Sequence, residues 1–225
     1  MLPLTKRERV LRTLRFQETD RVPLYDILQN DAIIEHYSGR KLTYDDGAHT
    51  VARAVGRVLD MTRMVAAPLP SADSIRTDGI HWRQERWTGW ILDRPFTDLK
   101  SLRPWIAERM REANERSFSA EDTDAMREHI ETNWAAFAET DPTGRNDPAV
   151  LVIESGVGLD SMYWMTGMEL FTELMFEDPD LLEEWIEALT AAEIRRVAAI
   201  ADPWHIPVAL TYSDIAHKTG TLFSP

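Results

Sequence analysis

The chain has 225 residues, enough for one large domain, and its 44% hydrophobic and 28% charged residues are an ordinary balance for a folded protein. The formal net charge of −13 and the lack of a long Lys/Arg cluster argue against a nucleic-acid partner, because phosphates require a basic surface. There is no cysteine, which excludes disulfides and thiolate metal ligands within this sequence.

Targeting signals are not evident in the sequence. No apolar run reaches the roughly 18–20 residues of a membrane helix. The N-terminal segment 1–15 is basic and amphipathic and has no continuous apolar core of the kind found in signal peptides. We therefore expect a cytoplasmic protein without a membrane partner.

The first elements are a helix and a strand. Thr5 and Glu8 have the spacing of a capping box, in which each side chain accepts a hydrogen bond from the other residue's amide, so a helix is predicted to begin here. The short apolar run 22–28 follows and predicts a buried strand. Pro23 lies near its beginning, where a missing amide donor matters least.

The next segments predict two helices, a strand and an excursion. The helices are expected around 31–37 and 44–59, and the second strand at 61–66. From 71 to 95 tryptophans alternate with charged residues, which predicts a hairpin excursion outside the main sheet.

The second half repeats the alternation of helix and strand. A helix is predicted over 122–139, and the bare apolar run 149–154 indicates a third strand that is buried on both faces. Asp178 and Pro179 form an N-cap followed by proline at the first helical position, so another helix begins there. A fourth strand is predicted at 206–212.

Strands that alternate with helices indicate an α/β protein with a parallel sheet covered by helices. Periodicity alone leaves two architectures open, an open doubly wound sheet and part of a (β/α)8 barrel. We find no internal repeat and no low-complexity linker, and therefore expect one domain over residues 1–225.

Three segments, taken together, resemble the uroporphyrinogen decarboxylase superfamily, which includes corrinoid-dependent methyltransferases. The first is the helix opening at 5–11 with Asp-Arg-Val-Pro at 20–23. The second is Glu-Asp-Pro-Asp-Leu at 177–181. The third is Ser-Asp-Ile-Ala-His-Lys-Thr-Gly at 213–220, followed by Ser-Pro at 224–225. Their order and spacing extend over nearly the whole chain.

The resemblance implies a (β/α)8 barrel, of which about four parallel strands, flanking helices and the excursion at about 71–95 are expected here. Family members continue past the Ser-Pro pair. In the methyltransferase branch a zinc site, built from a His-x-Cys motif and a distant cysteine, lies in that later part. We therefore expect an incomplete barrel without a metal site, which would acquire zinc only with a C-terminal half.

The resemblance also implies chemistry on a tetrapyrrole or a methylated corrinoid. The decarboxylase branch carries an arginine-rich motif after the first strand, whereas residues 26–31 contain no arginine, and its aspartate at the end of strand two corresponds here to Ala66 or Ala67. Both departures favour a protein of the methyltransferase type, which acts in methyl transfer involving a corrinoid, over a lyase that decarboxylates a tetrapyrrole. We expect it to be inactive without the missing C-terminal half. A third hypothesis, a non-catalytic half-barrel that serves in binding or assembly, also stays open.

Candidate site residues lie at the predicted strand ends, because TIM-barrel active sites form at the carboxyl ends of the strands. Asp26, Glu154 and Asp214 are the candidate catalytic carboxylates. Aspartate and serine after a strand also form ordinary helix caps and turns, so both interpretations are open. The candidate substrate-binding residues are Asn30, Arg63, Ser155, Tyr212 and His217.

Two further features have competing interpretations. Asp214 and His217 offer two metal ligands, but a site needs three or four, which favours a hydrogen-bonded loop histidine. The tryptophan-rich segment 82–90 is suited to stacking on a flat macrocycle, with Arg83 and Arg86 pairing its carboxylates. The alternative is a hairpin whose aromatic rings pack against the protein itself.

The expected partners follow from the incomplete sheet. Unpaired strand edges and an uncovered apolar face favour association. We therefore expect a homo-oligomer or pairing with a chain that carries the remaining strands. The expected ligand is a small-molecule substrate or a corrinoid protein.

Overall fold

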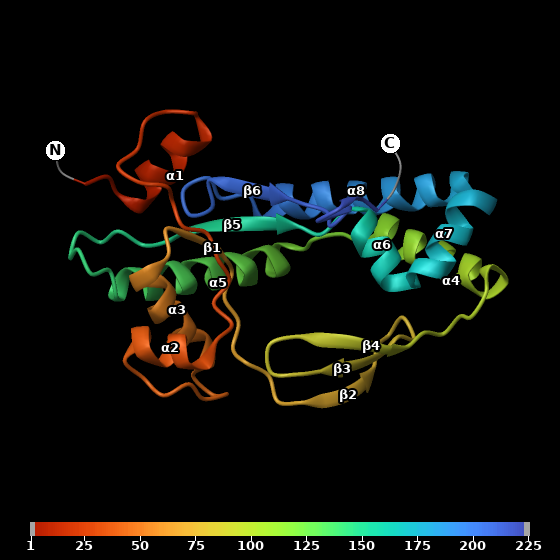
Figure 1. Cartoon of the computed structure of the whole chain (residues 1–225), viewed down its shortest axis with the longest axis horizontal. Coiled ribbons are helices and arrows are strands. Elements are labelled where there is room, and N and C mark those ends of the chain that lie inside the picture. The colour runs from red at the N-terminus through yellow and green to blue at the C-terminus, as the bar shows by residue number, and fades with distance from the viewer. Residues whose placement is uncertain (1–2, 223–225) are drawn as a thin grey trace. The chain divides into compact units, whose positions relative to one another are not determined.

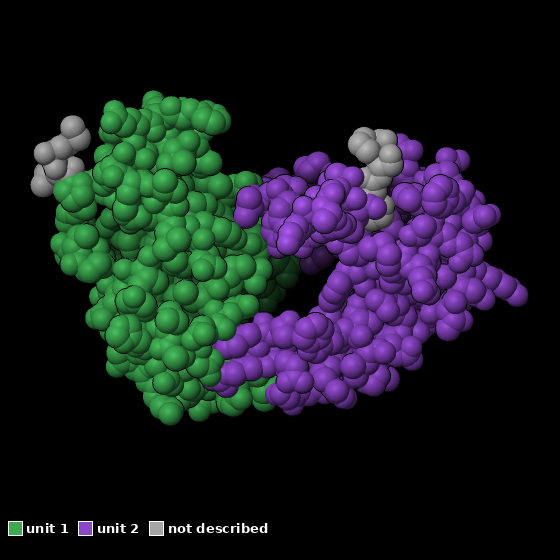
Figure 2. Space-filling model, viewed as in Figure 1, with its two compact units in different colours: residues 1–70, 120–154, 200–209 green, residues 71–119, 155–199, 210–225 purple. Residues whose placement is uncertain are grey.

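The computed structural model describes residues 3–222 (Figure 1). The chain folds into two compact units, coloured separately in Figure 2, and each unit combines segments that are far apart in the sequence. Unit 1 comprises Met1–Pro70, Ala120–Glu154 and Ile200–Ala209. Unit 2 comprises Ser71–Ser119, Ser155–Ala199 and Leu210–Pro225.

Unit 1 begins with the predicted capping box. The Oγ1 atom of Thr5 accepts a hydrogen bond from the Glu8 amide at 3.1 Å, and the Glu8 carboxylate accepts one from the Thr5 amide at 2.9 Å. The predicted helix start is therefore confirmed. The helices of unit 1 are α1 (Lys6–Leu14), α2 (Asp31–Ser38), α3 (Gly47–Val58) and α5 (Ala120–Glu139).

Helices α3 and α5 pack closely because α3 has a glycine at the contact. A Cβ atom added at Gly56 would lie 2.3 Å from the carbonyl oxygen of Phe137, so no other residue fits without a shift of backbone. Nearby, Thr140 Oγ1 donates a hydrogen bond to the carbonyl of Arg53 at 2.7 Å. Val55, Ile130 and Phe137 are fully buried in this unit.

The main sheet contains β1 (Met61–Arg63), β5 (Val150–Ser155) and β6 (Val208–Thr211) in the order β1-β5-β6, with β1 parallel to β5. These strands correspond to the predicted second, third and fourth strands. The predicted first strand at 22–28 is reduced to one parallel bridge, between Tyr25 and Met61. The Leu24 carbonyl accepts hydrogen bonds from the amides of Asp60 and Met61, whereas the Leu24 amide donates to the Asp60 carboxylate.

The protein is thus a mixed α/β structure with a three-stranded parallel sheet and flanking helices. Closure of such a sheet into a barrel stays a prediction. No helix in residues 3–222 combines the length and the apolar character needed to cross a lipid bilayer.

The predicted excursion at 71–95 is present in unit 2 as a small antiparallel sheet of three strands. These are β2 (Ala72–Ile75), β3 (His81–Gln84) and β4 (Gly89–Asp93), in that order across the sheet. Arg83 pairs with Asp73 of the neighbouring strand at 2.8 Å. The Trp82 ring contacts Trp164 edge to face, with 5.4 Å between the ring centroids.

The rest of unit 2 is largely helical. Its core is formed by apolar residues of all four helices, among them Ile106, Met162, Phe171 and Trp185. Only the last of these helices, after Pro179, was predicted from the sequence. The remaining elements are α4 (Leu99–Glu115), α6 (Leu159–Thr166), α7 (Met168–Glu177), α8 (Pro179–Ile200), β7 (Ala216–His217) and β8 (Gly220–Thr221).

Candidate functional site

The amino end of the sheet in unit 1 holds a buried ionic network around Asp60, the residue before β1. Its Oδ1 atom accepts hydrogen bonds from Arg9 at 2.6 Å and Arg21 at 2.8 Å. Its Oδ2 atom accepts a hydrogen bond from the Leu24 amide at 2.8 Å and one from a second Arg21 nitrogen at 2.5 Å. The Asp60 side chain is 0% exposed, so all of its charge is compensated by the protein itself. This network has a structural role.

The carboxyl end of the same sheet carries a second, more open cluster. Glu154 accepts a hydrogen bond from the Tyr25 hydroxyl at 2.7 Å and one from Arg63 at 2.8 Å. The Glu154 side chain is 16% exposed and that of Arg63 is 36% exposed. We call Tyr25, Arg63 and Glu154 the strand-end cluster.

Strand register explains why these three side chains meet. Tyr25 pairs with Met61, and Arg63 pairs with Val152. Side chains alternate between the faces of a sheet, so Arg63, Val152 and Glu154 lie on one face. Tyr25 shares that face through its bridge to Met61, and its long side chain reaches forward to Glu154. Three neighbouring parallel segments thus contribute one side chain each.

The strand-end cluster combines three chemical functions. A carboxylate serves as a proton acceptor or as a hydrogen-bond acceptor for substrate. The guanidinium of Arg63 has five N–H donors and uses one on Glu154, which leaves donors for a substrate oxygen. The Tyr25 hydroxyl holds the orientation of the carboxylate. Since Arg63 and Glu154 neutralise each other, the cluster favours a neutral polar ligand over a polyanion.

Two predicted residues of unit 1 have local roles in the structure. The Asp26 carboxylate accepts a hydrogen bond from the Ile27 amide at 2.7 Å, and Asn30 is the N-cap of α2, where it accepts from the Ile33 amide at 3.1 Å. Asp26 follows Tyr25 directly, so alternation directs it to the other face of the sheet from Glu154. Sequence reasoning therefore selected Asp26 and missed Tyr25, although two-residue alternation from the predicted strand would have identified it.

The remaining predicted residues, Ser155, Tyr212, Asp214 and His217, belong to unit 2. Ser155 ends β5, and Tyr212 is half exposed directly after β6. His217 is paired through Nδ1 with the Thr219 hydroxyl at 3.0 Å, so it is hydrogen-bonded as the sequence favours, but it lies in the short strand β7 and not in a loop.

Asp214 lies beside a polar group that sequence analysis did not identify. Its carbonyl oxygen accepts a hydrogen bond from the Tyr163 hydroxyl at 2.7 Å, and the neighbouring Ser213 hydroxyl donates to Asp160 at 2.6 Å. Burial, with the carboxylates of Asp160 and Asp214, raises the pKa of Tyr163. Because Asp214 and Glu154 belong to different units, a shared site for the predicted carboxylates stays a prediction.

Within residues 3–222, no group of three or more His, Cys, Asp or Glu side chains is arranged to hold a metal ion. Comparison of the chain with known protein families, curated proteins and solved structures found no match.

Proposed function

We propose that this chain is a uroporphyrinogen decarboxylase-like protein of the methyltransferase type, which takes part in methyl transfer involving a corrinoid. In this proposal the strand-end cluster contacts the corrinoid or the methyl acceptor. The observation that carries the proposal is the position of Glu154, held by Tyr25 and Arg63 at the carboxyl ends of neighbouring parallel segments. Active sites of parallel α/β proteins form at this edge.

The charge of the cluster supports a corrinoid over a decarboxylase substrate. A uroporphyrinogen carries many carboxylates and needs several cationic partners, whereas Arg63 is already paired with Glu154 at 2.8 Å. A corrinoid carries carboxamide side chains, each of which both donates and accepts hydrogen bonds. Arg63 is suited to donate to an amide oxygen, and Glu154 to accept from an amide nitrogen.

One of the sequence segments that resemble this superfamily leads to the cluster. The Asp-Arg-Val-Pro segment at 20–23 leads directly to Tyr25, and Arg21 and Asp20 both belong to the buried network at the opposite end of the sheet. The segment thus anchors the entry to the sheet and delivers Tyr25 to its position beside Glu154. The proposed partners are a free corrinoid or a corrinoid-carrying protein.

The proposal is tested by isothermal titration of the full chain with methylcobalamin. We expect saturable binding by the wild type and a loss of about tenfold in affinity for Glu154→Gln, since a hydrogen bond to a charged group is worth about 1.5–3 kcal/mol. Glu131→Gln is the matched control, because it makes the same change at an exposed position of α5 and should bind like the wild type.

Two outcomes contradict the proposal. One is the absence of methylcobalamin binding at millimolar concentration, and the other is equal binding by the wild type and Glu154→Gln. A parallel titration with uroporphyrin separates the two enzyme classes. Tighter binding of uroporphyrin than of methylcobalamin would favour the decarboxylase alternative.

A further inference from the structure

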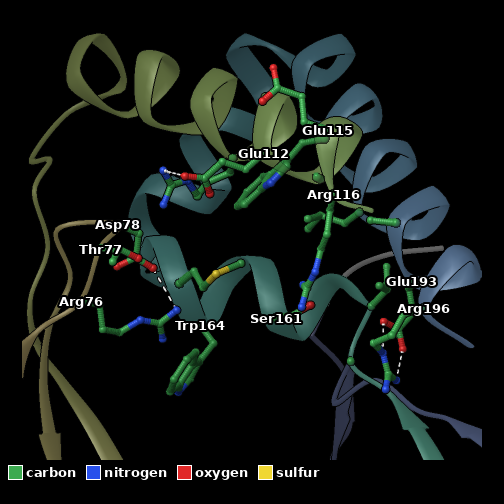
Figure 3. Close-up of a pocket in the computed structure, with 18 residues that line it drawn as sticks. Arg76, Thr77, Asp78, Glu112, Glu115, Arg116, Ser161, Trp164, Glu193 and Arg196 are labelled. Carbon is green, nitrogen blue, oxygen red and sulfur yellow. Dashed lines mark hydrogen bonds and ion pairs between the residues drawn. The ribbon is translucent and has the colours of Figure 1, made fainter. Parts of the chain in front are cut away.

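Unit 2 contains a pocket of about 830 Å³ that is lined by residues of this unit alone (Figure 3). Its walls come from the turn between β2 and β3, from the C-terminal part of α4, and from α6 and α8. Pockets that hold organic ligands have volumes of about 300–1,000 Å³, so this one has room for a molecule of several rings. None of its residues belongs to the strand-end cluster.

Most of the charge in the pocket is compensated internally. Three of its four arginines form ion pairs with carboxylates that also line it, as the dashed lines in Figure 3 show in part. The pairs are Arg76 with Asp78 at 2.9 Å, Arg109 with Glu112 at 2.8 Å, and Arg196 with Glu193 at 2.8 Å between Nε and Oε2. The fourth carboxylate, Glu115, shares Arg111 on its own helix with Glu108.

Arg116 is the exception. It is the C-cap residue of α4, and its side chain extends into the pocket towards Ser161 in Figure 3. Its guanidinium lies 5.4 Å from the centre of the Phe118 ring, and no carboxylate in the described part of the chain forms an ion pair with it. One positive charge in the pocket is therefore available to an anion.

The pocket also offers apolar surface. Trp164 is 45% exposed, and Met165 and Leu189 lie on the same lining. The Nε1–H of Trp185 and the Nε–H of Arg109 have no acceptor among the described residues, but neither nitrogen has exposed surface, so neither is available to a ligand.

We propose that this pocket binds a flat, apolar molecule with a single acidic group, such as a polycyclic aromatic carboxylate. The acid pairs with Arg116, and the ring system lies against Trp164, Met165 and Leu189. One uncompensated cation selects one anionic group, and the exposed tryptophan favours a flat ring. This site goes beyond the proposed methyl transfer, which depends on residues of unit 1 alone.

The test uses two fluorescent probes with the same ring system, 1-pyrenebutyrate and the neutral 1-pyrenebutanol. Fluorescence anisotropy of each probe is measured against increasing concentrations of the full chain. The wild type should bind the acid about tenfold more tightly than the alcohol, which corresponds to one charge-assisted hydrogen bond. Equal affinity for both probes, or binding of neither, would overturn the proposal.

Two variants test whether the carboxylate of the probe pairs with Arg116. Arg116→Met should lower the affinity for the acid about tenfold and leave that for the alcohol unchanged, because the methionine keeps the apolar part of the side chain. Arg127→Met is the matched control. It makes the same change at an arginine of α5 outside the pocket, whose side chain is exposed and pairs with the exposed Asp124. A loss of acid binding that is equal in the two variants would show a non-specific charge effect and overturn the site. Neither result bears on methylcobalamin binding through Glu154.

Discussion

The two ends of the sheet in unit 1 hold carboxylates of opposite character. Asp60, before β1, is 0% exposed and is surrounded by two arginines and a backbone amide. Glu154, near the end of β5, is 16% exposed and is held by Tyr25 and Arg63. Both are paired with arginine, yet only Glu154 keeps contact with solvent.

The difference shows how burial changes what an arginine–carboxylate pair must provide. A buried carboxylate must be fully compensated, since removal from water costs several kcal/mol, and the Asp60 side chain, at 0% exposed, is out of reach of a ligand. A partly exposed carboxylate exchanges water for a ligand at small cost. In parallel α/β proteins the carboxyl end of the sheet carries the chemistry, and under the proposed function Glu154 would take that role here.

The strongest test of this comparison is Asp60→Asn. We expect a loss of about 3 kcal/mol in the free energy of unfolding, because the change leaves Arg9 buried with one counter-charge fewer. Urea unfolding followed by tryptophan fluorescence measures it. Asp124→Asn removes an exposed partner of Arg127 and should change stability by less than about 0.5 kcal/mol. If both substitutions changed the free energy of unfolding by similar amounts, the Asp60 network would stabilise the fold no more than an ordinary surface pair does.

The pH dependence of stability provides a second test at the amino end. Hydrogen bonds from Arg9 hold the pKa of Asp20 well below its usual range. A carboxyl group with a lowered pKa in the folded state stabilises the fold above its unfolded pKa of about 4, and this contribution is lost as the pH falls below that value. The urea midpoint of the wild type should therefore decrease more between pH 6 and pH 3 than that of Asp20→Asn. Parallel curves for the two proteins would contradict this assignment.

Thr5→Ala tests the helix that carries Arg9 into the network. Loss of the side-chain cap should lower the free energy of unfolding by about 1 kcal/mol. Thr13→Ala makes the same change at an exposed position of α1 and, because alanine favours helix, should leave stability unchanged or slightly higher. If both substitutions were neutral, the capping box would contribute nothing to the position of Arg9.

The smallest effect on stability is expected at the other end of the sheet. Glu154→Gln retains an acceptor for Tyr25 and removes a partly exposed charge, so it should cost less than about 1 kcal/mol. The same variant is expected to weaken methylcobalamin binding. Urea unfolding beside the titration checks both quantities, and a loss as large as that of Asp60→Asn would assign Glu154 a structural role.

Local sequence signals identified much of the secondary structure, because they act within a few residues. The spacing of Thr5 and Glu8 predicted the start of α1, and Asp178 with Pro179 marked the start of α8. The apolar run at 149–154 predicted β5, and alternating tryptophans predicted the excursion. Leu99, Leu102 and Ile106 of α4 also have helical spacing and are buried, so that helix was predictable too, although it was not predicted.

Side-chain pairs between distant segments were decided by tertiary structure alone. Tyr25 and Glu154 are 129 positions apart, and their hydrogen bond depends on the register of two strand pairings. A shift of one residue in the pairing of β1 with β5 would turn Glu154 to the other face, and a shift in the pairing of Tyr25 with Met61 would turn Tyr25 away from it. The sequence indicated a carboxylate at the end of this strand. The identity of its partners depends on which segments the folded chain brings together, and so does the lack of an ion pair at Arg116 within residues 3–222.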